Sequence, residues 1–182
     1  MRKRGIRLNK ISYKKIIYTQ QQLSERIAEL GKKITAYYEG QEIVLLGVLK
    51  GSLFFCTDLA RAIDLPMQMD MIAIGSIPDT TSSTGIVRIT KDLDINITGK
   101  HVIVVEDIIR TGLTTAYLLQ TLEARRPASV EVCTLLYNPE RQLIDLPVKY
   151  YGFEVDRSWL IGYGMDSGEY GRNLPFIAEM EH

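Results

Sequence analysis

The chain has 182 residues, of which 46% are hydrophobic and 24% are charged, the balance of an ordinary globular protein and not of a disordered one. Its 22 basic and 22 acidic residues cancel, so the overall charge favours no nucleic-acid partner. No uncharged run approaches the roughly 20 apolar residues of a membrane-spanning helix, so no membrane span is expected. The length suits one domain, 1–182. Cys56 and Cys133 lie among apolar neighbours, which predicts two small core residues in the reducing cytoplasm.

The first 18 residues form a basic N-terminal arm. Residues 1–18 hold seven Lys or Arg side chains, and the first acidic residue of the chain is Glu25. No apolar stretch follows the basic start, which excludes a secretory signal. A solvated terminus is the simpler interpretation, and an arm that contacts anions or RNA is the alternative.

A helix is predicted to begin at Thr19, because Gln22 stands three residues later, as in a capping box. Gly40 is predicted to end it. The apolar residues between these two signals recur at helical spacing and share one face: Leu23, Ile27, Leu30 and Ile34. The continuous apolar run 43–48 follows, which is typical of a strand buried on both faces of a sheet.

Strands and helices alternate along the rest of the chain. After a helix over 54–63, the pattern predicts strands over 69–74, 102–105 and 130–136, a helix over 112–125, and later strands over 150–153 and 159–163. Alternation of this kind predicts an α/β fold, with a parallel central sheet flanked by helices.

The segment 75–91 interrupts this pattern. It is rich in Ser, Thr, Gly and Asp, contains Pro78 and has little apolar periodicity. Loops of this length inside a compact domain are usually functional or disordered. We interpret the segment as a mobile lid, with a protruding hairpin as the alternative.

The loop after the strand 102–105 contains the candidate functional residues. Glu106 and Asp107 follow the strand directly, at the carboxyl edge of the sheet where ligands bind in open parallel folds. Gly112 permits an unusual backbone turn, and the N–H groups and Thr hydroxyls beside it can then cradle an anion at the start of a helix. The Gly-Lys-Ser/Thr ending of a Walker loop is missing.

These residues carry a family resemblance. An apolar run, an acidic pair, two apolar residues and Thr-Gly-x-Thr resemble the phosphoribosyl-pyrophosphate motif of type I phosphoribosyltransferases. Residues 47–52, Gly-Val-Leu-Lys-Gly-Ser, resemble the pyrophosphate loop of the hypoxanthine-guanine branch, which implies a cis Leu49–Lys50 peptide bond. Further matches extend the resemblance from about Leu23 to Phe176: 82–85, 91–94, 152–155, 162–166 and 172–175.

The resemblance implies a set of roles and a small hood built from the N- and C-terminal segments. The catalytic residues would be Glu106, Asp107 and Arg110. Phosphoribosyl pyrophosphate would be bound by Leu49, Lys50, Gly51, Glu106, Asp107, Arg110, Thr111, Gly112, Leu113, Thr114, Thr115 and Arg172. The base would contact Ile109, Asn138, Trp159 and Leu160, with a buried core position as the alternative for the tryptophan. Mg²⁺ would be held by Glu106, Asp107 and Asp166. The implied partners are phosphoribosyl pyrophosphate, a nucleobase and further copies of the chain in a homodimer or homotetramer.

Three residues depart from the family pattern. Arg110 stands where the hypoxanthine-guanine branch has an Asp that accepts from the purine ring, and arginine has only donors. Asn138 stands where a Lys is usual, and Ile77 where a Tyr is usual. Three functions therefore stay open: a purine phosphoribosyltransferase, with hypoxanthine or guanine as the default base; a transferase for a different base; and a non-catalytic RNA-binding regulator, as the pyrimidine attenuation regulators are. The neutral charge speaks against the last.

Overall fold

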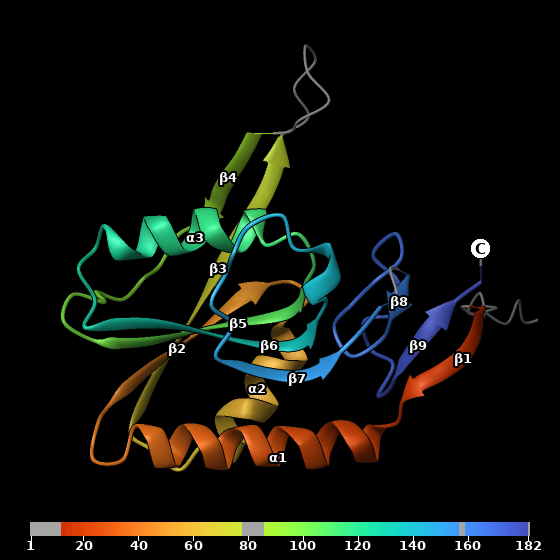
Figure 1. Cartoon of the computed structure of the whole chain (residues 1–182), viewed down its shortest axis with the longest axis horizontal. Coiled ribbons are helices and arrows are strands. Elements are labelled where there is room, and N and C mark those ends of the chain that lie inside the picture. Colours follow the sequence, from red (N-terminus) through yellow and green to blue (C-terminus); the bar gives the residue numbers. More distant parts are fainter. Residues whose placement is uncertain (1–11, 78–85, 157–158, 182) are drawn as a thin grey trace, which may run out of the picture.

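The computed structural model describes residues 12–77, 86–156 and 159–181, and Figure 1 shows how they are arranged. A central sheet of six strands has the order β4-β3-β2-β5-β6-β7. The bounds are Ile86–Lys91 for β4, Met67–Ile77 for β3, Ile43–Leu49 for β2, His101–Ile109 for β5, Ser129–Tyr137 for β6 and Tyr150–Glu154 for β7. All neighbours are parallel except β3 and β4, which are antiparallel. The predicted α/β fold is confirmed, and the correction to it is the antiparallel edge strand β4.

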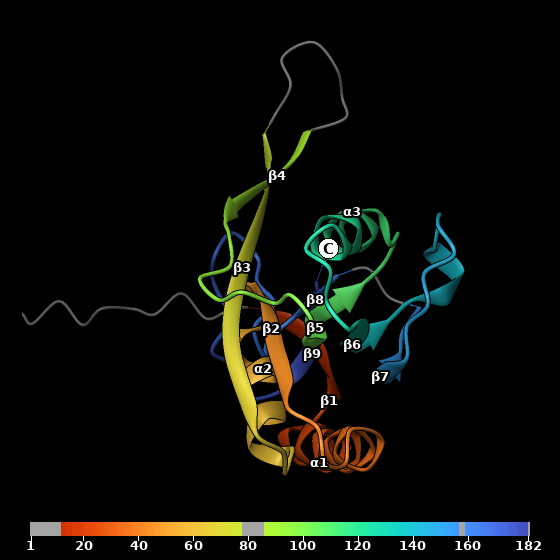
Figure 2. The same cartoon turned by 90° about the vertical axis from the view of Figure 1, so that its left-hand side faces the viewer.

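Helices cover both faces of this sheet. Helices α1 (Gln20–Tyr37) and α2 (Leu53–Ala62) lie on one face and α3 (Leu113–Glu123) on the other, as the edge-on view in Figure 2 shows. The predicted capping box of α1 is present, because the Gln22 backbone N–H donates to Thr19 Oγ1 at 3.3 Å and the Thr19 N–H donates to Gln22 Oε1 at 2.9 Å.

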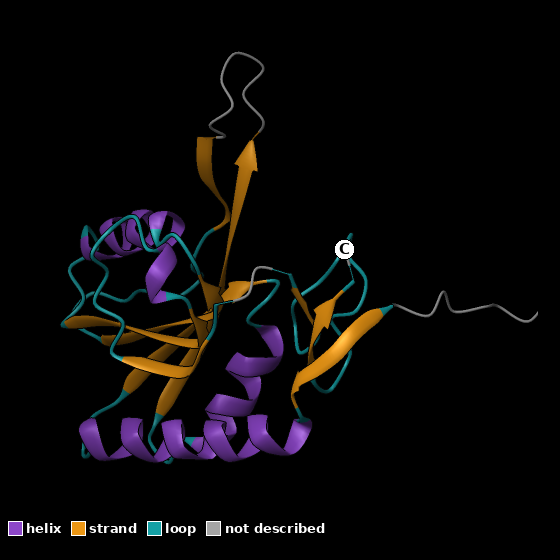
Figure 3. Ribbon diagram, turned by 45° about the vertical axis from the view of Figure 1, so that its right-hand side comes forward, coloured by secondary structure: helices purple, strands orange, loops and turns teal. Residues whose placement is uncertain are grey.

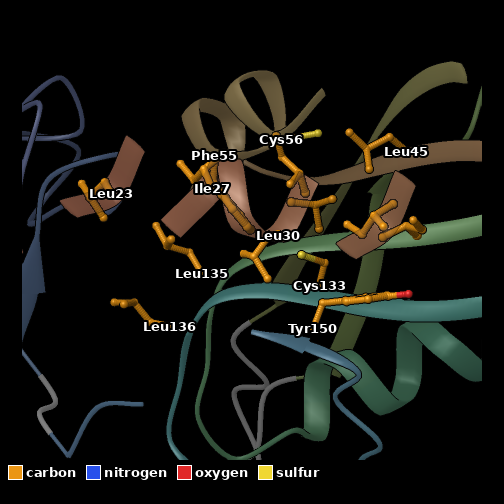
Figure 4. Close-up of a cluster of buried hydrophobic side chains, with 14 of the residues drawn as sticks. Leu23, Ile27, Leu30, Leu45, Phe55, Cys56, Cys133, Leu135, Leu136 and Tyr150 are labelled. Carbon is orange, nitrogen blue, oxygen red and sulfur yellow. The ribbon is translucent and has the colours of Figure 1, made fainter. Parts of the chain in front are cut away.

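The two-residue period of the central strands divides the core in two. Ile43 and Leu45 of β2 pack with the face covered by α1 and α2, whereas Val44 and Leu46 pack with the face covered by α3. Successive side chains of a strand point to opposite faces, so a strand apolar at every position is buried on both. Figure 4 shows the first cluster, which also contains both predicted core cysteines, Cys56 and Cys133, as buried free thiols.

A second, three-stranded sheet forms the hood expected from the resemblance. Its order is β1-β9-β8, with bounds Tyr13–Tyr18, Ile177–Met180 and Leu160–Ile161, and Figure 3 shows it beside the central sheet. Buried Leu160 and Ile177 belong to the same apolar cluster as α1 and α2, so the hood shares the core of the domain.

The hood places part of the basic arm. Residues 1–11 lie outside the described part of the chain, but Lys14 and Lys15 belong to β1, and Lys14 Nζ lies 3.5 Å from a Glu179 carboxylate oxygen of β9. The last third of the predicted arm is therefore a strand of the hood and not a frayed terminus.

Part of the predicted lid, 75–91, is also strand. β3 continues to Ile77 and β4 begins at Ile86, so the ends of the segment are paired with each other, and they project from the body of the domain in Figure 1. The tip, 78–85, lies outside the described residues, and its movement over the site stays a prediction. In the described part of the chain, no helix is long and apolar enough to cross a membrane.

Candidate active site

The site lies where two neighbouring parallel strands end. Gly47 of β2 pairs with Val105 of β5, so the loop after β2 lies beside the acidic pair that follows. The Leu49–Lys50 peptide bond is cis, as the resemblance implied. Gly51 then passes so close to Asp107 that a Cβ on it would lie 2.0 Å from Asp107 Oδ2. The absence of a side chain at Gly51 is thus what allows the two loops to meet.

A cavity of about 500 Å³ opens beside this contact. Ten predicted site residues line it: Glu106, Asp107, Ile109, Arg110, Thr111, Gly112, Thr114, Thr115, Leu160 and Asp166. Two further lining residues, Ile108 and Met165, were not predicted. Their positions next to Asp107 and Asp166 in the sequence are the only signal that could have indicated them.

The acidic pair is buried. Glu106 is 7% exposed, and Thr115 Oγ1 donates to its carboxylate over a long 3.4 Å. Burial, and next the Asp107 carboxylate, raise the pKa of Glu106 to about 8. Burial also raises the pKa of Asp107, although two backbone N–H groups and the cations Arg110 and Arg172 oppose the shift. Two desolvated carboxyl groups with raised pKa values form a place where a cation or hydroxyl donors would be favourable.

The turn after the acidic pair presents backbone donors. Gly112 has φ +78°, the left-handed region that favours glycine, and it caps the N-terminus of α3. Within the described residues, the first backbone N–H of this turn to donate to a backbone carbonyl is that of Ala116, to Gly112. The N–H groups from Thr111 to Thr115 are left for a ligand, at the positive end of the helix dipole.

A network of charged side chains lies near Asp107 and includes Arg172, whose charge acts on that carboxyl group. Arg172 Nη2 lies 2.8 Å from Asp166 Oδ1 and 3.2 Å from Glu169 Oε2, and Arg172 Nη1 donates to the Gly164 carbonyl at 2.8 Å. Lys50 Nζ donates to the same Glu169 oxygen at 3.0 Å. Lys50 first, and then Arg172, lower the pKa of Glu169. The predicted pyrophosphate-binding cations are therefore held together by a carboxylate that the sequence did not indicate.

The predicted base-binding residues divide into two groups. Ile109 and Leu160 are buried and line the cavity. Asn138 does not: its side chain is buried, and its Oδ1 accepts from the Arg141 N–H at 3.2 Å at the start of the short 3₁₀ helix Pro139–Arg141. Trp159 is 61% exposed and is not part of the lining, so it is not the buried core aromatic considered as its alternative.

Arg110 is exposed at the cavity. Among residues 12–77, 86–156 and 159–181, its side chain makes no hydrogen bond or ion pair, and its charge acts on Asp107 by opposing the rise of that pKa. It is also the one cation among the side chains that line the described cavity. The guanidinium is thus available to an acceptor group bound there.

The donor set suits a hard cation that keeps part of its hydration. In the described ranges, no three Asp, Glu, His or Cys side chains converge on one point. Mg²⁺ is commonly held by one or two carboxylates, with water and substrate phosphates completing its shell. Glu106, Asp107 and Asp166 line the same cavity, and they fit that mode of binding and not a closed all-protein cage.

Comparison with known proteins agrees with this geometry. The family model of the phosphoribosyl transferase domain matches residues 14–167. The chain belongs to the phosphoribosyltransferase family. It is 42% identical to the hypoxanthine-guanine phosphoribosyltransferase of Mycobacterium avium over 174 residues, which are 92% of this chain and 86% of that protein. It is 44% identical to the hypoxanthine-guanine-xanthine phosphoribosyltransferase of Tritrichomonas foetus over 164 residues, 90% of this chain and 89% of that one.

A solved member of the family has the same fold. The crystal structure of a hypoxanthine-guanine phosphoribosyltransferase from Bacillus anthracis, with a HEPES molecule in its active site, matches with a TM-score of 0.89 at 44% identity. The match covers 93% of this chain and 100% of the other. The resemblance inferred from the loop motifs is confirmed, and the cavity at the C-terminal end of β5 is the candidate active site of this phosphoribosyltransferase.

Proposed function

We propose that this phosphoribosyltransferase transfers the 5-phosphoribosyl group of phosphoribosyl pyrophosphate to a purine base, releases pyrophosphate and acts in purine salvage. Hypoxanthine and guanine are the default bases, as the names of the relatives indicate. One observation carries the proposal: a single cavity combines a buried acidic pair with a turn, Thr111 to Thr115, whose N–H groups donate to no backbone carbonyl among the described residues. A doubly charged phosphate and a ribose with two hydroxyl groups need these two kinds of partner side by side.

The turn at Gly112 would hold the 5′-phosphate. Backbone N–H groups at a helix N-terminus point toward a bound phosphate, and the helix dipole favours its negative charge. The hydroxyls of Thr111 and Thr114 add donors, whereas the hydroxyl of Thr115 already donates to Glu106. This anchor fixes the ribose so that its hydroxyls face Glu106 and Asp107. Lys50, Gly51 and Arg172 would hold the pyrophosphate, since Gly51 lies against Asp107 and Glu169 bridges the two cations.

The carboxylates Glu106, Asp107 and Asp166 fit Mg²⁺, which would neutralise the charge that develops on the leaving pyrophosphate. In the transfer, the bond between ribose C1 and the pyrophosphate oxygen breaks and a base nitrogen forms the new bond to C1, while the proton of the base passes to solvent or to the released pyrophosphate. The protein contributes position and the exclusion of water, and the carboxylates stabilise a sugar that becomes cationic on the way.

A second candidate is a transferase for a different acceptor base, and Arg110 is the observation that favours it. The guanidinium is unpartnered among the described residues and can only donate. It would pair with a carbonyl oxygen or with an anionic ring nitrogen of the base, which neutral hypoxanthine does not offer at its five-membered ring.

With either acceptor base, the protein would act in the cytoplasm as a homodimer or homotetramer.

Calorimetry with phosphoribosyl pyrophosphate tests the assignment of the acidic pair. Asp107→Asn keeps the size of the side chain but removes its charge, so it should weaken Mg²⁺-dependent binding by tenfold or more, since a lost charged contact is worth roughly 1.5–3 kcal/mol. The matched control is Asp145→Asn, at an exposed position outside the cavity, and it should bind as the wild type does. Equal affinity of Asp107→Asn and wild type with Mg²⁺ present would contradict the proposal.

A further inference from the structure

The carboxylate of Glu169 occupies the two cations that the proposed function assigns to pyrophosphate. Its Oε2 lies 3.0 Å from Lys50 Nζ and 3.2 Å from Arg172 Nη2. One anionic oxygen thus bridges an ammonium and a guanidinium from segments 122 positions apart in the sequence, as a phosphate oxygen would. No other carboxylate of the described residues pairs with Lys50.

The backbone at Glu169 does not explain why a glutamate stands there. Ser167 and Tyr170 exchange backbone hydrogen bonds of 3.0 and 3.2 Å, so Gly168 and Glu169 are the two central residues of a tight hairpin turn. Both have positive φ, +58° and +70°, as in a type I′ turn. The second of these positions favours glycine strongly, and a glutamate there is held against its backbone preference. Its side chain, and not its backbone, is therefore the feature that the turn presents.

The network has a fixed part and a movable part. Arg172 is 22% exposed, and it is held by the Gly164 carbonyl at 2.8 Å and by Asp166 Oδ1 at 2.8 Å. Gly164 in turn packs against the Gly51 carbonyl so closely that a Cβ on it would lie 1.9 Å away. Glu169 is 62% exposed at the tip of its turn. The carboxylate can therefore swing into solvent while the guanidinium keeps its place.

We propose that Glu169 is an internal counter-anion of the pyrophosphate subsite, and that the diphosphate must displace its carboxylate from Lys50 and Arg172. The inference rests on the proposed function, because it takes the two cations as the diphosphate ligands. Exposed ion pairs are individually weak, so a multiply charged diphosphate wins the exchange. The carboxylate keeps the cations paired when the subsite is empty, and it lowers the affinity for released pyrophosphate.

Two variants remove the carboxylate without disturbing the turn. Glu169→Gln keeps the shape of the side chain, and Glu169→Gly suits the positive φ, so neither should lower the unfolding temperature. Because two exposed ion pairs no longer compete, both should bind inorganic pyrophosphate about three- to tenfold more tightly than the wild type, with Mg²⁺ present. The Michaelis constant of both variants for phosphoribosyl pyrophosphate should also be lower than that of the wild type.

Glu39→Gln is the matched control for the change in net charge. Glu39 is exposed near the end of α1 and has no ion pair or hydrogen bond among the described residues, so its removal adds the same charge away from the site. Glu39→Gln should bind pyrophosphate as the wild type does. Lys50→Met should weaken binding, and in a Lys50→Met background the gain from Glu169→Gln should shrink, because one of the two competing pairs is already gone.

The outcomes separate this inference from the proposed function. If wild type does not bind pyrophosphate, or if Lys50→Met binds it as well as wild type, the assignment of the subsite itself fails. If Lys50→Met weakens binding but both Glu169 variants bind no more tightly than wild type and Glu39→Gln, the subsite stands and the counter-anion is refuted. Weaker binding by both Glu169 variants would also refute it, since the carboxylate would then be aiding the ligand.

Discussion

The contact between Gly51 and Asp107 makes a sharp prediction for Gly51→Ala. The added Cβ would lie 2.0 Å from Asp107 Oδ2 and 2.4 Å from Cγ, so the carboxylate must move by about 1 Å before even a tight contact of 3.0 Å is reached. The obstacle is the end of a side chain and not a backbone, so the fold can give way there at little cost in stability. A displacement of about 1 Å at a catalytic group can lower the rate about 100-fold. Gly51→Ala should therefore lose about two orders of magnitude in kcat/KM while its unfolding temperature stays within a few degrees of wild type.

Gly99→Ala is the control, which should lower the stability of the fold and leave the activity unchanged. A Cβ at Gly99 meets nothing within 4 Å, but its φ of +72° is strained for alanine, which should destabilise the fold by about 1 kcal/mol. Its activity at a temperature where it is folded should equal that of wild type. Pyrophosphate release and thermal unfolding measured on both variants decide the point. Wild-type kcat/KM in Gly51→Ala, or a loss that Gly99→Ala shares, would refute the reasoning.

Two further changes test the rest of the structure. Burial raises the pKa of Asp70, but the N–H groups of Met71, Asp94 and Ile95 and the Lys91 ammonium outweigh burial and lower the pKa below its ordinary value. The stabilisation by the ionised carboxylate is present above the pKa of the unfolded state and is lost as the pH falls through the pKa of the folded state. In urea unfolding, Asp70→Asn should therefore cost about 2 kcal/mol at pH 7 and much less at pH 3, and an equal cost at both pH values would contradict this reasoning. Arg110→Asp restores a hydrogen-bond acceptor beside the proposed base site, so it should raise turnover of hypoxanthine by about 10²-fold or more and leave the affinity for phosphoribosyl pyrophosphate nearly unchanged. If the wild type turns over hypoxanthine fast and Arg110→Asp reduces that rate, the proposed effect of Arg110 is wrong.

Features encoded by neighbouring residues could be predicted from the sequence. The start of α1 depends on Thr19 and Gln22, three positions apart, and the anion-binding turn depends on one contiguous stretch that includes Gly112. The buried strands β2 and β5 are apolar at nearly every position because both faces are covered. In each case, the physical cause lies within a few residues of the effect.

Features that depend on partners far apart in the sequence could not be predicted from it. β1 pairs with β9 across most of the chain, and the charges of Lys14 and Lys15 conceal its strand character. The bridge from Lys50 through Glu169 joins segments that only the fold brings together. Asn138 shows the reverse case. Its side chain accepts from the Arg141 N–H, three residues later, and the local sequence Asn-Pro-x-Arg already indicated this cap.

The measurement that tests the central claim most directly is pyrophosphate release from phosphoribosyl pyrophosphate by the wild-type chain, with Mg²⁺ and a panel of oxo-purines and pyrimidines. We expect release that requires both the metal and a base, with formation of the matching nucleoside monophosphate. A base other than hypoxanthine or guanine as the best acceptor would favour the second candidate, in which Arg110 reads the base. No release with any base of the panel would contradict the transferase function altogether.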